Sequence, residues 1–163
     1  FNNAYGQTFV LPEGEVNEDT MLVQGTNGEK MSKSKGNTID IFLPEKKLRK
    51  QIMSIVSNSE ALEDPKIPDS CNIFALYAIL AEKDDVSKMR RNYEEGGYGY
   101  GHAKQALYEL ILEKFKAERE KYNYLMEHKN EIDDALSIGA QKAKNIAHDV
   151  LSRVRQKVGY AGG

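Results

Sequence analysis

The chain has 163 residues, a net charge of −2 and a single cysteine, Cys71. A chain of this length buries a core without help from a metal or a disulfide, and one cysteine excludes an internal disulfide. No apolar run approaches the roughly 20 residues that cross a bilayer, and no basic segment followed by an apolar one resembles a secretory signal. We therefore predict a soluble, cytoplasmic protein of one domain, or of one domain with a remnant of another.

The charge is unevenly distributed along the chain. Residues 1–29 contain five acidic side chains and no Lys or Arg, whereas residues 30–50 contain seven Lys or Arg and two acids. A local reversal of this kind focuses an anion onto a short segment, although most charge runs are only solvated surface. The pattern alone leaves both interpretations open.

The first 43 residues are interpreted as the end of a larger α/β region. Two short apolar runs, residues 8–11 and residues 20–23, have the composition of strands, and Gly25-Thr26-Asn27-Gly28 is a turn signal. The sequence opens on Phe1 without an initiator Met. We expect the chain to be the C-terminal part of a longer protein whose main α/β portion precedes Phe1.

Residues 44–163 are predicted to be helical. Pro44 suits the first turn of a helix, and apolar residues then recur at helical spacing between breaks at residues 64–68 and 96–101. The fourth helix is expected to run from near His102 to Met126. The expected core faces are Leu48, Ile52, Ile55 and Val56; Ile73, Leu76, Tyr77 and Leu80; Val86, Met89 and Tyr93; Ala103, Leu107, Leu110, Ile111, Phe115, Tyr122 and Met126; and Ile132, Leu136, Ala140, Ala143, Ala147, Val150, Val154 and Val158.

Three of these helices have candidate capping side chains at their starts. They are Asp69 or Ser70 for the second, Asp84 or Asp85 for the third, and Asn130 with Asp133 for the last. The predicted fold is mainly α, a C-terminal bundle of about five helices preceded by a short α/β remnant.

The segment Lys30-Met31-Ser32-Lys33-Ser34 has the chemistry of a polyphosphate site. Lysine is a compact point charge for phosphate oxygens, and serine hydroxyls and exposed loop amides add hydrogen bonds. Glycines on both sides leave such a loop free to open and close. As bare composition, a loop of this kind is more often solvated surface.

These five residues match the second signature motif of the class I aminoacyl-tRNA synthetases. Within that class, three segments resemble the tryptophan branch: residues 48–59, residues 98–104, and residues 139–147 followed by Arg153-Val154-Arg155. The resemblance implies that residues 1–43 are the C-terminal tail of a Rossmann-type, nucleotide-binding catalytic domain and carry the KMSKS loop. Residues 44–163 would form the helical anticodon-binding domain.

The resemblance also implies an activity. Enzymes of this branch activate tryptophan with ATP, accompanied by Mg²⁺, and transfer it to tRNA(Trp); the full-length protein would be a homodimer. Lys33, with Lys30 as its partner, would stabilise the pyrophosphate, and Met31, Ser32 and Ser34 would complete the ATP site. The tryptophan pocket would lie before Phe1, so residues 1–163 alone are predicted to be inactive.

In the helical half, Lys104 sits where the family places a lysine directed at anticodon bases. Arg90 and Arg91 are candidates for tRNA phosphates, and Tyr98 and Tyr100 are candidates for base stacking, although packing of these tyrosines is the more common outcome. The three histidines share no metal-ligand spacing, and Cys71 has no neighbouring His. We predict no dedicated metal site.

Two alternatives remain open from the sequence. One is the same region of another class I synthetase, the tyrosine enzyme foremost. The other is a non-catalytic helical RNA-binding module that retains the loop as a relic.

Overall fold

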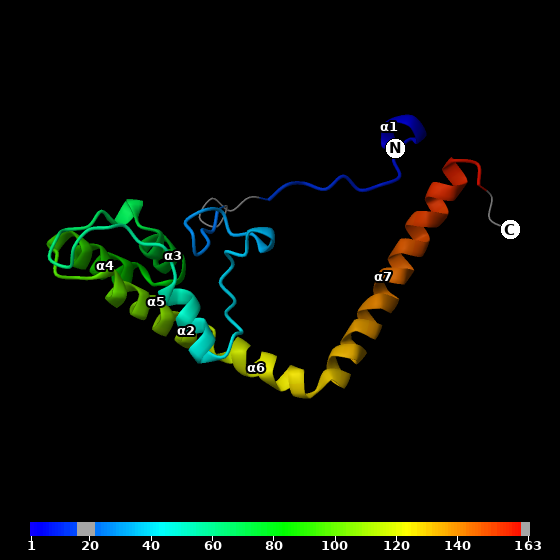
Figure 1. Cartoon of the computed structure of the whole chain (residues 1–163). Helices are drawn as coiled ribbons and strands as arrows, with labels where there is room; N and C mark the ends of the chain where they lie inside the picture. The colour runs from blue at the N-terminus through cyan, green and yellow to red at the C-terminus, as the bar shows by residue number, and fades with distance from the viewer. Residues whose placement is uncertain (16–21, 161–163) are drawn as a thin grey trace. The chain divides into compact units, whose positions relative to one another are not determined.

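The computed structural model of the chain describes residues 1–15 and 22–160, and these are almost entirely helices and loops (Figure 1). No β-strand is formed within these residues, and an isolated antiparallel bridge joins Gln24 to Lys30. The prediction of a mainly α fold is confirmed. In chain order the elements are α1 (Asn2–Tyr5), η2 (Lys33–Lys35), α2 (Glu45–Met53), η3 (Pro68–Ser70), α3 (Asn72–Leu80), α4 (Lys83–Glu95), α5 (Tyr100–Lys114), α6 (Lys116–Glu127) and α7 (Lys129–Lys157).

The predicted strands are wrong where the structure describes them. The backbone N–H groups of Thr8 and Phe9 both donate to Oδ1 of Asn2, each at 3.0 Å. The Asn2 side chain therefore accepts the hydrogen bonds of these two backbone N–H groups, so they need no acceptor on a neighbouring strand. In the second run, Leu22 and Val23 are not in a strand, and residues 20 and 21 lie outside the described residues.

The described residues divide into two compact units. One lies within Phe1–Glu15 and Asn123–Gly163, and the other lies within Val16–Tyr122. The buried core belongs to the second unit and comes from α2 to α5 and their connections. Its members are Leu48, Ile52, Ile55, Cys71, Ile73, Phe74, Leu76, Met89, Tyr93, Ala103, Leu107, Tyr108 and Ile111.

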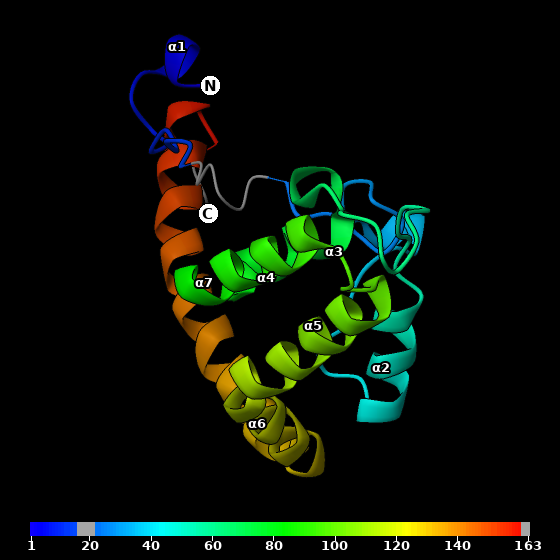
Figure 2. The same cartoon turned by 90° about the vertical axis from the view of Figure 1, so that its left-hand side faces the viewer.

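Helix α5 is the centre of this core, because it packs against both α2 and α3 (Figure 2). Ala103 and Leu107 are fully buried and Ile111 is 2% exposed, at the i, i+4 and i+8 spacing that places them on one helix face. The predicted core faces of the first four helices are confirmed at most of their positions.

Four details of the predictions for the first four helices are wrong. Helix α2 ends at Met53, so Val56 lies beyond it and is 59% exposed. Helix α3 has Cys71 as its N-cap without a side-chain cap, since Asp69 and Ser70 belong to η3. The start of α4 and the continuity of the long helix after residue 100 also differ from the prediction.

Helix α4 begins after Glu82, which makes no side-chain cap, and Asp84 and Asp85 lie in its first turn. There their charges still favour the positive end of the helix dipole. The long helix expected from His102 to Met126 is interrupted at Phe115, whose ψ of 21° ends α5. Phe115 is thereby partly buried against the core.

Helix α7 is long, and its predicted inward stripe is half-buried at Ile132, Val150 and Val154 and exposed at its other positions. No residue of α7 is buried, and Leu136 is 65% exposed. The expected cap at Asn130 is also absent, because the helix begins after His128 without a side-chain cap. Apolar periodicity marks one face of a helix, but it does not say what covers that face.

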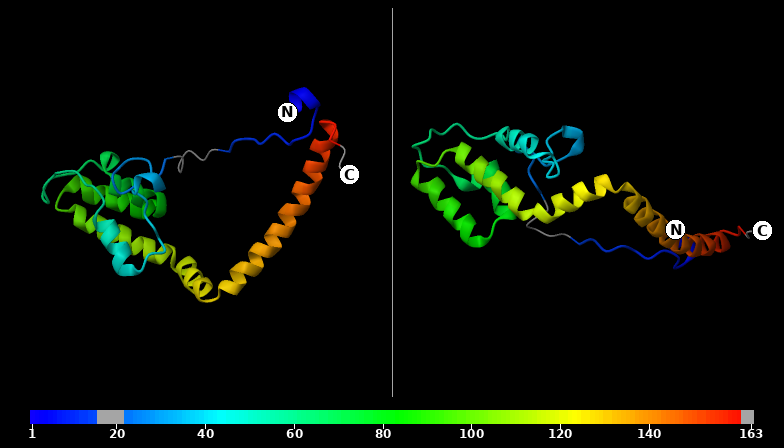
Figure 3. Two further views of the ribbon diagram at one scale, coloured as in Figure 1. Left: turned by 45° about the vertical axis from the view of Figure 1, so that its right-hand side comes forward. Right: turned by 90° about the horizontal axis from the view of Figure 1, so that it is seen from below.

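The first residues of the chain, around α1, lie beside the C-terminal end of α7 (Figure 3). Lys157 donates from Nζ to the carbonyl oxygen of Gln7 at 2.8 Å. Phe9 shares an apolar depression with Ala147, Val150 and Val154. None of the described helices is long and apolar enough to cross a membrane.

Lys66 is buried at the bend between α2 and η3 and is only 3% exposed. Its Nζ donates to the carbonyl oxygens of Ala61 at 2.9 Å, Leu62 at 3.2 Å and Asp64 at 2.8 Å, and it lies 5.6 Å from the centre of the Tyr100 ring. Burying a cation is costly unless its donors are satisfied. Three carbonyl acceptors satisfy the Lys66 ammonium and give the bend its shape.

Replacing Lys66 with Met keeps an unbranched stem and removes the three donors. We expect Lys66→Met to lower the free energy of unfolding by about 2 kcal/mol, because three carbonyl oxygens lose their common donor at the bend. Urea unfolding followed by helical circular dichroism measures this change. Lys46→Met, on the exposed side of α2, is the control and should change stability by less than about 0.5 kcal/mol. Equal small changes in both variants would contradict the role of Lys66.

Candidate functional site

The loop between residues 24 and 37 is closed by its own backbone. Gly25 N–H donates to the Glu29 carbonyl oxygen at 2.7 Å, and Gly28 N–H donates to the Gly25 carbonyl oxygen at 3.1 Å. Together with the bridge between Gln24 and Lys30, these bonds form a turn that leads directly into the basic motif. The turn predicted from Gly25-Thr26-Asn27-Gly28 is confirmed.

The basic motif itself is a single turn of 3-10 helix. Ser32 precedes η2 in an extended conformation, and Gly36 follows it at φ 63°, where its N–H donates to the Lys33 carbonyl oxygen. The hydroxyl oxygens of Ser32 and Ser34 are 2.8 Å apart and hydrogen-bonded. The serines therefore support each other, and their remaining hydrogen-bonding capacity faces solvent on an exposed loop.

The three lysines of the loop differ in their partners. Lys35 Nζ lies 2.8 Å from Oε2 of Glu29, and this hydrogen bond lowers the pKa of the Glu29 carboxyl. Lys30 and Lys33 are exposed, and neither has an acidic partner within salt-bridge distance among the described residues. The structure therefore leaves two ammonium groups available to an anion, and these are the two predicted catalytic lysines.

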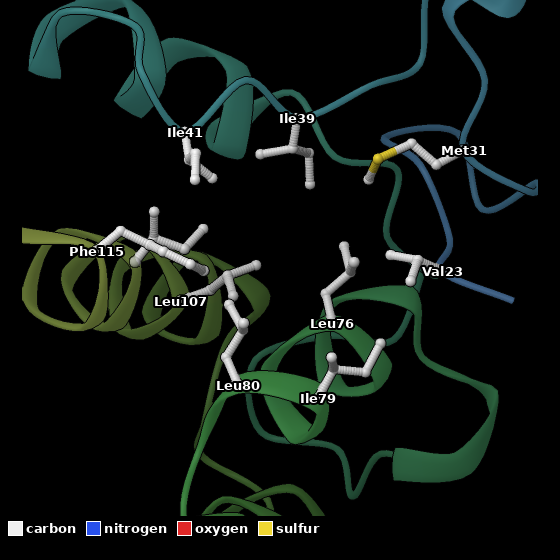
Figure 4. A pocket seen from close by; sticks show the side chains of 10 residues that line it. Val23, Met31, Ile39, Ile41, Leu76, Ile79, Leu80, Leu107 and Phe115 are labelled. Atoms are coloured by element: carbon white, nitrogen blue, oxygen red, sulfur yellow. The ribbon is translucent and has the colours of Figure 1, made fainter. Parts of the chain in front are cut away.

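Met31 turns away from solvent, toward the helices. Its side chain lines an apolar cavity of about 130 Å³ together with Ile39 and Ile41 from the connecting segment and Leu76 and Leu107 from α3 and α5 (Figure 4). Met31 N–H also donates to the Val23 carbonyl oxygen at 2.8 Å. Met31, the second residue of the motif, is thus an apolar contact between the loop and the helical core.

Two further hydrogen bonds attach the base of the loop to the helices. Val56 N–H, just past the end of α2, donates to the Thr26 carbonyl oxygen at 2.8 Å. Nδ2 of Asn72, the first residue of α3, donates to the Gly25 carbonyl oxygen at 2.9 Å. The position of the loop is therefore set by the ends of two helices.

Lys104 contacts the end of another helix. Its Nζ donates to the carbonyl oxygen of Met53, the last residue of α2, at 3.2 Å, and burial lowers the pKa of this amine. Lys114, ten residues on in α5, similarly donates to the carbonyl oxygen of Leu80, the last residue of α3, at 2.5 Å. Cations at helix C-termini satisfy free carbonyl groups and favour the helix dipole. Each lysine therefore fastens one neighbouring helix to α5.

The two arginine candidates lie in different surroundings. The Arg90 guanidinium makes two hydrogen bonds to the Asp69 carboxylate, at 2.6 and 3.1 Å, and lies 5.0 Å from the centre of the Phe74 ring. Arg91 is exposed and has no hydrogen bond or ion pair among the described residues. Of the two, Arg91 has the freer charge.

The two tyrosines of the Gly-Tyr loop are packed into the protein. The Tyr100 hydroxyl donates to Oε2 of Glu60 at 2.6 Å, a bond that lowers the pKa of the Glu60 carboxyl, while burial raises the pKa of Tyr100. Tyr98 lies against Tyr93 and His102, with ring centres 5.9 and 5.5 Å apart. These contacts favour packing over base stacking.

No cluster of three or more His, Cys, Asp or Glu side chains in the described part of the chain is arranged to hold a metal ion. The donors that converge on the motif are amines, hydroxyls and backbone N–H groups, which suit phosphate oxygens.

A sequence profile of the family described as tRNA synthetases class I (W and Y) matches residues 1–116. The chain belongs to this family of class I tRNA synthetases. It is 48% identical to a tryptophan–tRNA ligase of Campylobacter jejuni over 97% of its own length and 50% of the relative's. It is 42% identical to the tryptophan–tRNA ligase of Fusobacterium nucleatum over 99% of its length and 50% of the relative's.

A solved structure agrees with these relatives. The tryptophanyl-tRNA synthetase of Campylobacter jejuni complexed with ADP and tryptophan superimposes with a TM-score of 0.83 at 47% identity, covering 97% of this chain and 50% of that one. The chain thus spans about half the length of the class I tRNA synthetases that it matches. The predicted resemblance is confirmed.

Two residues that hold the synthetase loop in place were not predicted from the sequence. Asn37 is 2% exposed, and Asn72 ties Gly25 to α3, yet neither was predicted to belong to the site. The pattern that could have indicated Asn37 was its place directly after Gly36, at the end of the basic loop. Nothing in the sequence marked Asn72, because its partner is 47 residues away.

We expect Lys104→Ala to lower the free energy of unfolding of this synthetase chain by about 1 kcal/mol, because the end of α2 loses its cation. Lys114→Ala should have a smaller effect of the same sign, since Lys114 is exposed. Urea unfolding of both variants measures these changes, with Lys88→Ala, exposed on α4, as the control. Lys104→Ala as stable as Lys88→Ala would show that water replaces the amine at Met53.

Proposed function

We propose that the chain is the C-terminal part of a tryptophan–tRNA ligase, which activates tryptophan with ATP and transfers it to tRNA(Trp). The observation that carries the proposal is that Lys30 and Lys33 have no acidic partner among the described residues and lie on a loop whose backbone is already fixed. The identity to tryptophan ligases across nearly the whole chain supports the choice of amino acid. We further propose that the full-length protein is a homodimer that works in the cytoplasm.

The proposed chemistry places charge on the loop lysines. When the tryptophan carboxylate attacks the α-phosphorus of ATP, the bond to the leaving pyrophosphate breaks and negative charge grows on its oxygens. A cation that is already in place stabilises that charge without reorganising. Lys33 is assigned this role, with Lys30 as its partner, while Ser32, Ser34 and the backbone at Met31 complete the ATP contacts.

Mg²⁺ is proposed to arrive with ATP. The loop supplies amines and hydroxyls, and these fit the phosphate oxygens that the metal leaves uncoordinated. The role of Mg²⁺ would be to neutralise phosphate charge, while Lys33 and Lys30 bind the same phosphates from the protein side.

Lys33→Ala in the full-length enzyme should lower kcat of tryptophan-dependent ATP–pyrophosphate exchange by about 10²–10³-fold and leave the KM for tryptophan unchanged, because the contact strengthens in the transition state. Lys35→Ala is a control within the same loop. Lys35 is paired with Glu29, so its loss should have little effect on kcat. Equal effects of the two substitutions would remove Lys33 from the proposed role.

The division of the chain into residues 1–43, the tail of the catalytic domain, and residues 44–163, the anticodon-binding domain, is part of the proposal. Lys104 is proposed to read an anticodon base. An ammonium has three donors, and the bond to Met53 uses one of them. Arg91 is proposed to bind tRNA phosphates because its charge is free, and Arg90 would contribute only if it left Asp69.

Lys104→Ala should weaken charging of tRNA(Trp) and reduce discrimination against an anticodon variant, by about 1–3 kcal/mol if a base contact is lost. Adenylate formation should be nearly unchanged. Lys114→Ala is the matched control, since it removes an equivalent helix-end contact from α5. Charging kinetics on both tRNAs decide the question: equal discrimination by wild type and Lys104→Ala would leave Lys104 with its structural role alone.

The tyrosine enzyme is the second candidate, because the matching family profile covers both amino acids. Pyrophosphate exchange by the full-length protein with tryptophan and with tyrosine separates the two. Exchange with neither amino acid would favour the non-catalytic RNA-binding module.

A further inference from the structure

Asn37 is a buried polar residue directly after the exposed basic turn of the loop. It is 2% exposed, whereas Lys33, Ser34, Lys35 and Gly36 directly before it are exposed. An amide side chain is costly to bury unless its hydrogen-bonding groups are paired. The position of Asn37 therefore depends on the bonds that it makes inside the loop.

Those bonds fix the backbone on both sides of Met31. Oδ1 of Asn37 accepts from Ser32 N–H at 2.8 Å. Nδ2 donates to the Lys30 carbonyl oxygen at 3.2 Å and to Oδ1 of Asn27 at 2.7 Å. One side chain thus holds the end of Lys30 and the start of Ser32, which precedes the helical turn that carries Lys33.

Gly25 completes this arrangement from the opposite side. A Cβ atom at Gly25 would lie 2.4 Å from the carbonyl oxygen, 2.5 Å from Cγ and 2.6 Å from Nδ2 of Asn37, which is closer than non-bonded atoms approach. Thr26 N–H also donates to the Asn37 carbonyl oxygen at 2.9 Å. Only glycine allows the turn to pack this closely against Asn37.

We propose that Asn37, seated against Gly25, is a positioning residue that sets the placement of Lys30 and Lys33 for the phosphates; this rests on the proposed function of the loop. The neutrality of the side chain matters. An aspartate here would lose both donors and would attract the two lysines that the reaction needs free. Asparagine holds the loop through hydrogen bonds of a neutral side chain, so the positive charges of Lys30 and Lys33 remain available to the phosphates.

The test uses the full-length enzyme and tryptophan-dependent ATP–pyrophosphate exchange. Asn37→Leu removes the side-chain bonds at similar size, and Gly25→Ala pushes Asn37 out of place without changing it. We expect each to lower kcat by about 10²-fold, as small misplacements of catalytic groups do, with the KM for tryptophan unchanged. Asn130→Leu and Gly139→Ala, both at exposed positions on α7, are the matched controls and should retain wild-type kcat.

A double-mutant cycle separates positioning from a general structural role. If Asn37 acts through Lys33, Asn37→Leu should cost much less in kcat when Lys33 is already Ala than it costs in the wild type. The same kcat loss with and without Lys33 would overturn the proposal, as would wild-type kcat in Asn37→Leu and Gly25→Ala. Should Asn37→Leu fail to fold, Gly25→Ala and Asn27→Ala decide by the same criterion.

Failure of the proposed function has a different signature. If Lys33→Ala alone exchanges pyrophosphate at the wild-type rate, the loop lysines do not serve the reaction and the positioning proposal falls with them. If Lys33→Ala is slow and Asn37→Leu is not, the function of the loop stands and only the role of Asn37 is rejected.

Discussion

The packing of α5 against α2 and α3 is the interaction on which the loop depends. Ala103, Leu107 and Ile111 bury one face of α5, and Lys104 and Lys114 hold the last carbonyls of α2 and α3. The loop base is then attached just past the end of α2 and at the start of α3, through Val56 and Asn72. Because both attachment points belong to helices fixed on α5, the basic loop is carried by the helical core.

The loop obtains its order from neutral hydrogen bonds. Backbone amides, Asn27 and Asn37 account for most of its internal contacts, and its ion pair, Lys35 with Glu29, involves a lysine outside the five-residue motif. An ion pair at Lys30 or Lys33 would have to be broken before a phosphate could bind. Ordering the backbone through uncharged groups avoids that cost and keeps two cations ready for an anion.

The helices of the core could be predicted from the sequence because each buries one apolar stripe at helical spacing. Leu48 and Ile52 in α2, and Leu107 and Ile111 in α5, follow directly from that pattern. The same pattern in α7 predicted a buried face, but no residue of α7 is fully buried in the described structure, because periodicity does not identify a partner. The strand prediction for residues 8–11 failed for a related reason: composition favoured a strand, and the side chain of Asn2 supplied the bonds instead.

The lysines show why the site could be predicted only in part. The motif itself identified Lys30 and Lys33, and neither has an acidic partner in the part of the chain that the structure describes. Lys66 was not marked by the sequence and Lys104 was expected at the anticodon, yet Lys66 is buried under three carbonyl oxygens and Lys104 caps α2. What a lysine does is decided by the acceptors that the fold brings to it, and here these are backbone carbonyls. Every residue has a carbonyl, so no residue type marks such an acceptor in the sequence; it exists only once a helix has ended or a bend has formed. A motif read from residue types can therefore locate charges that act on a ligand, whereas charges that hold the fold together become visible only in three dimensions.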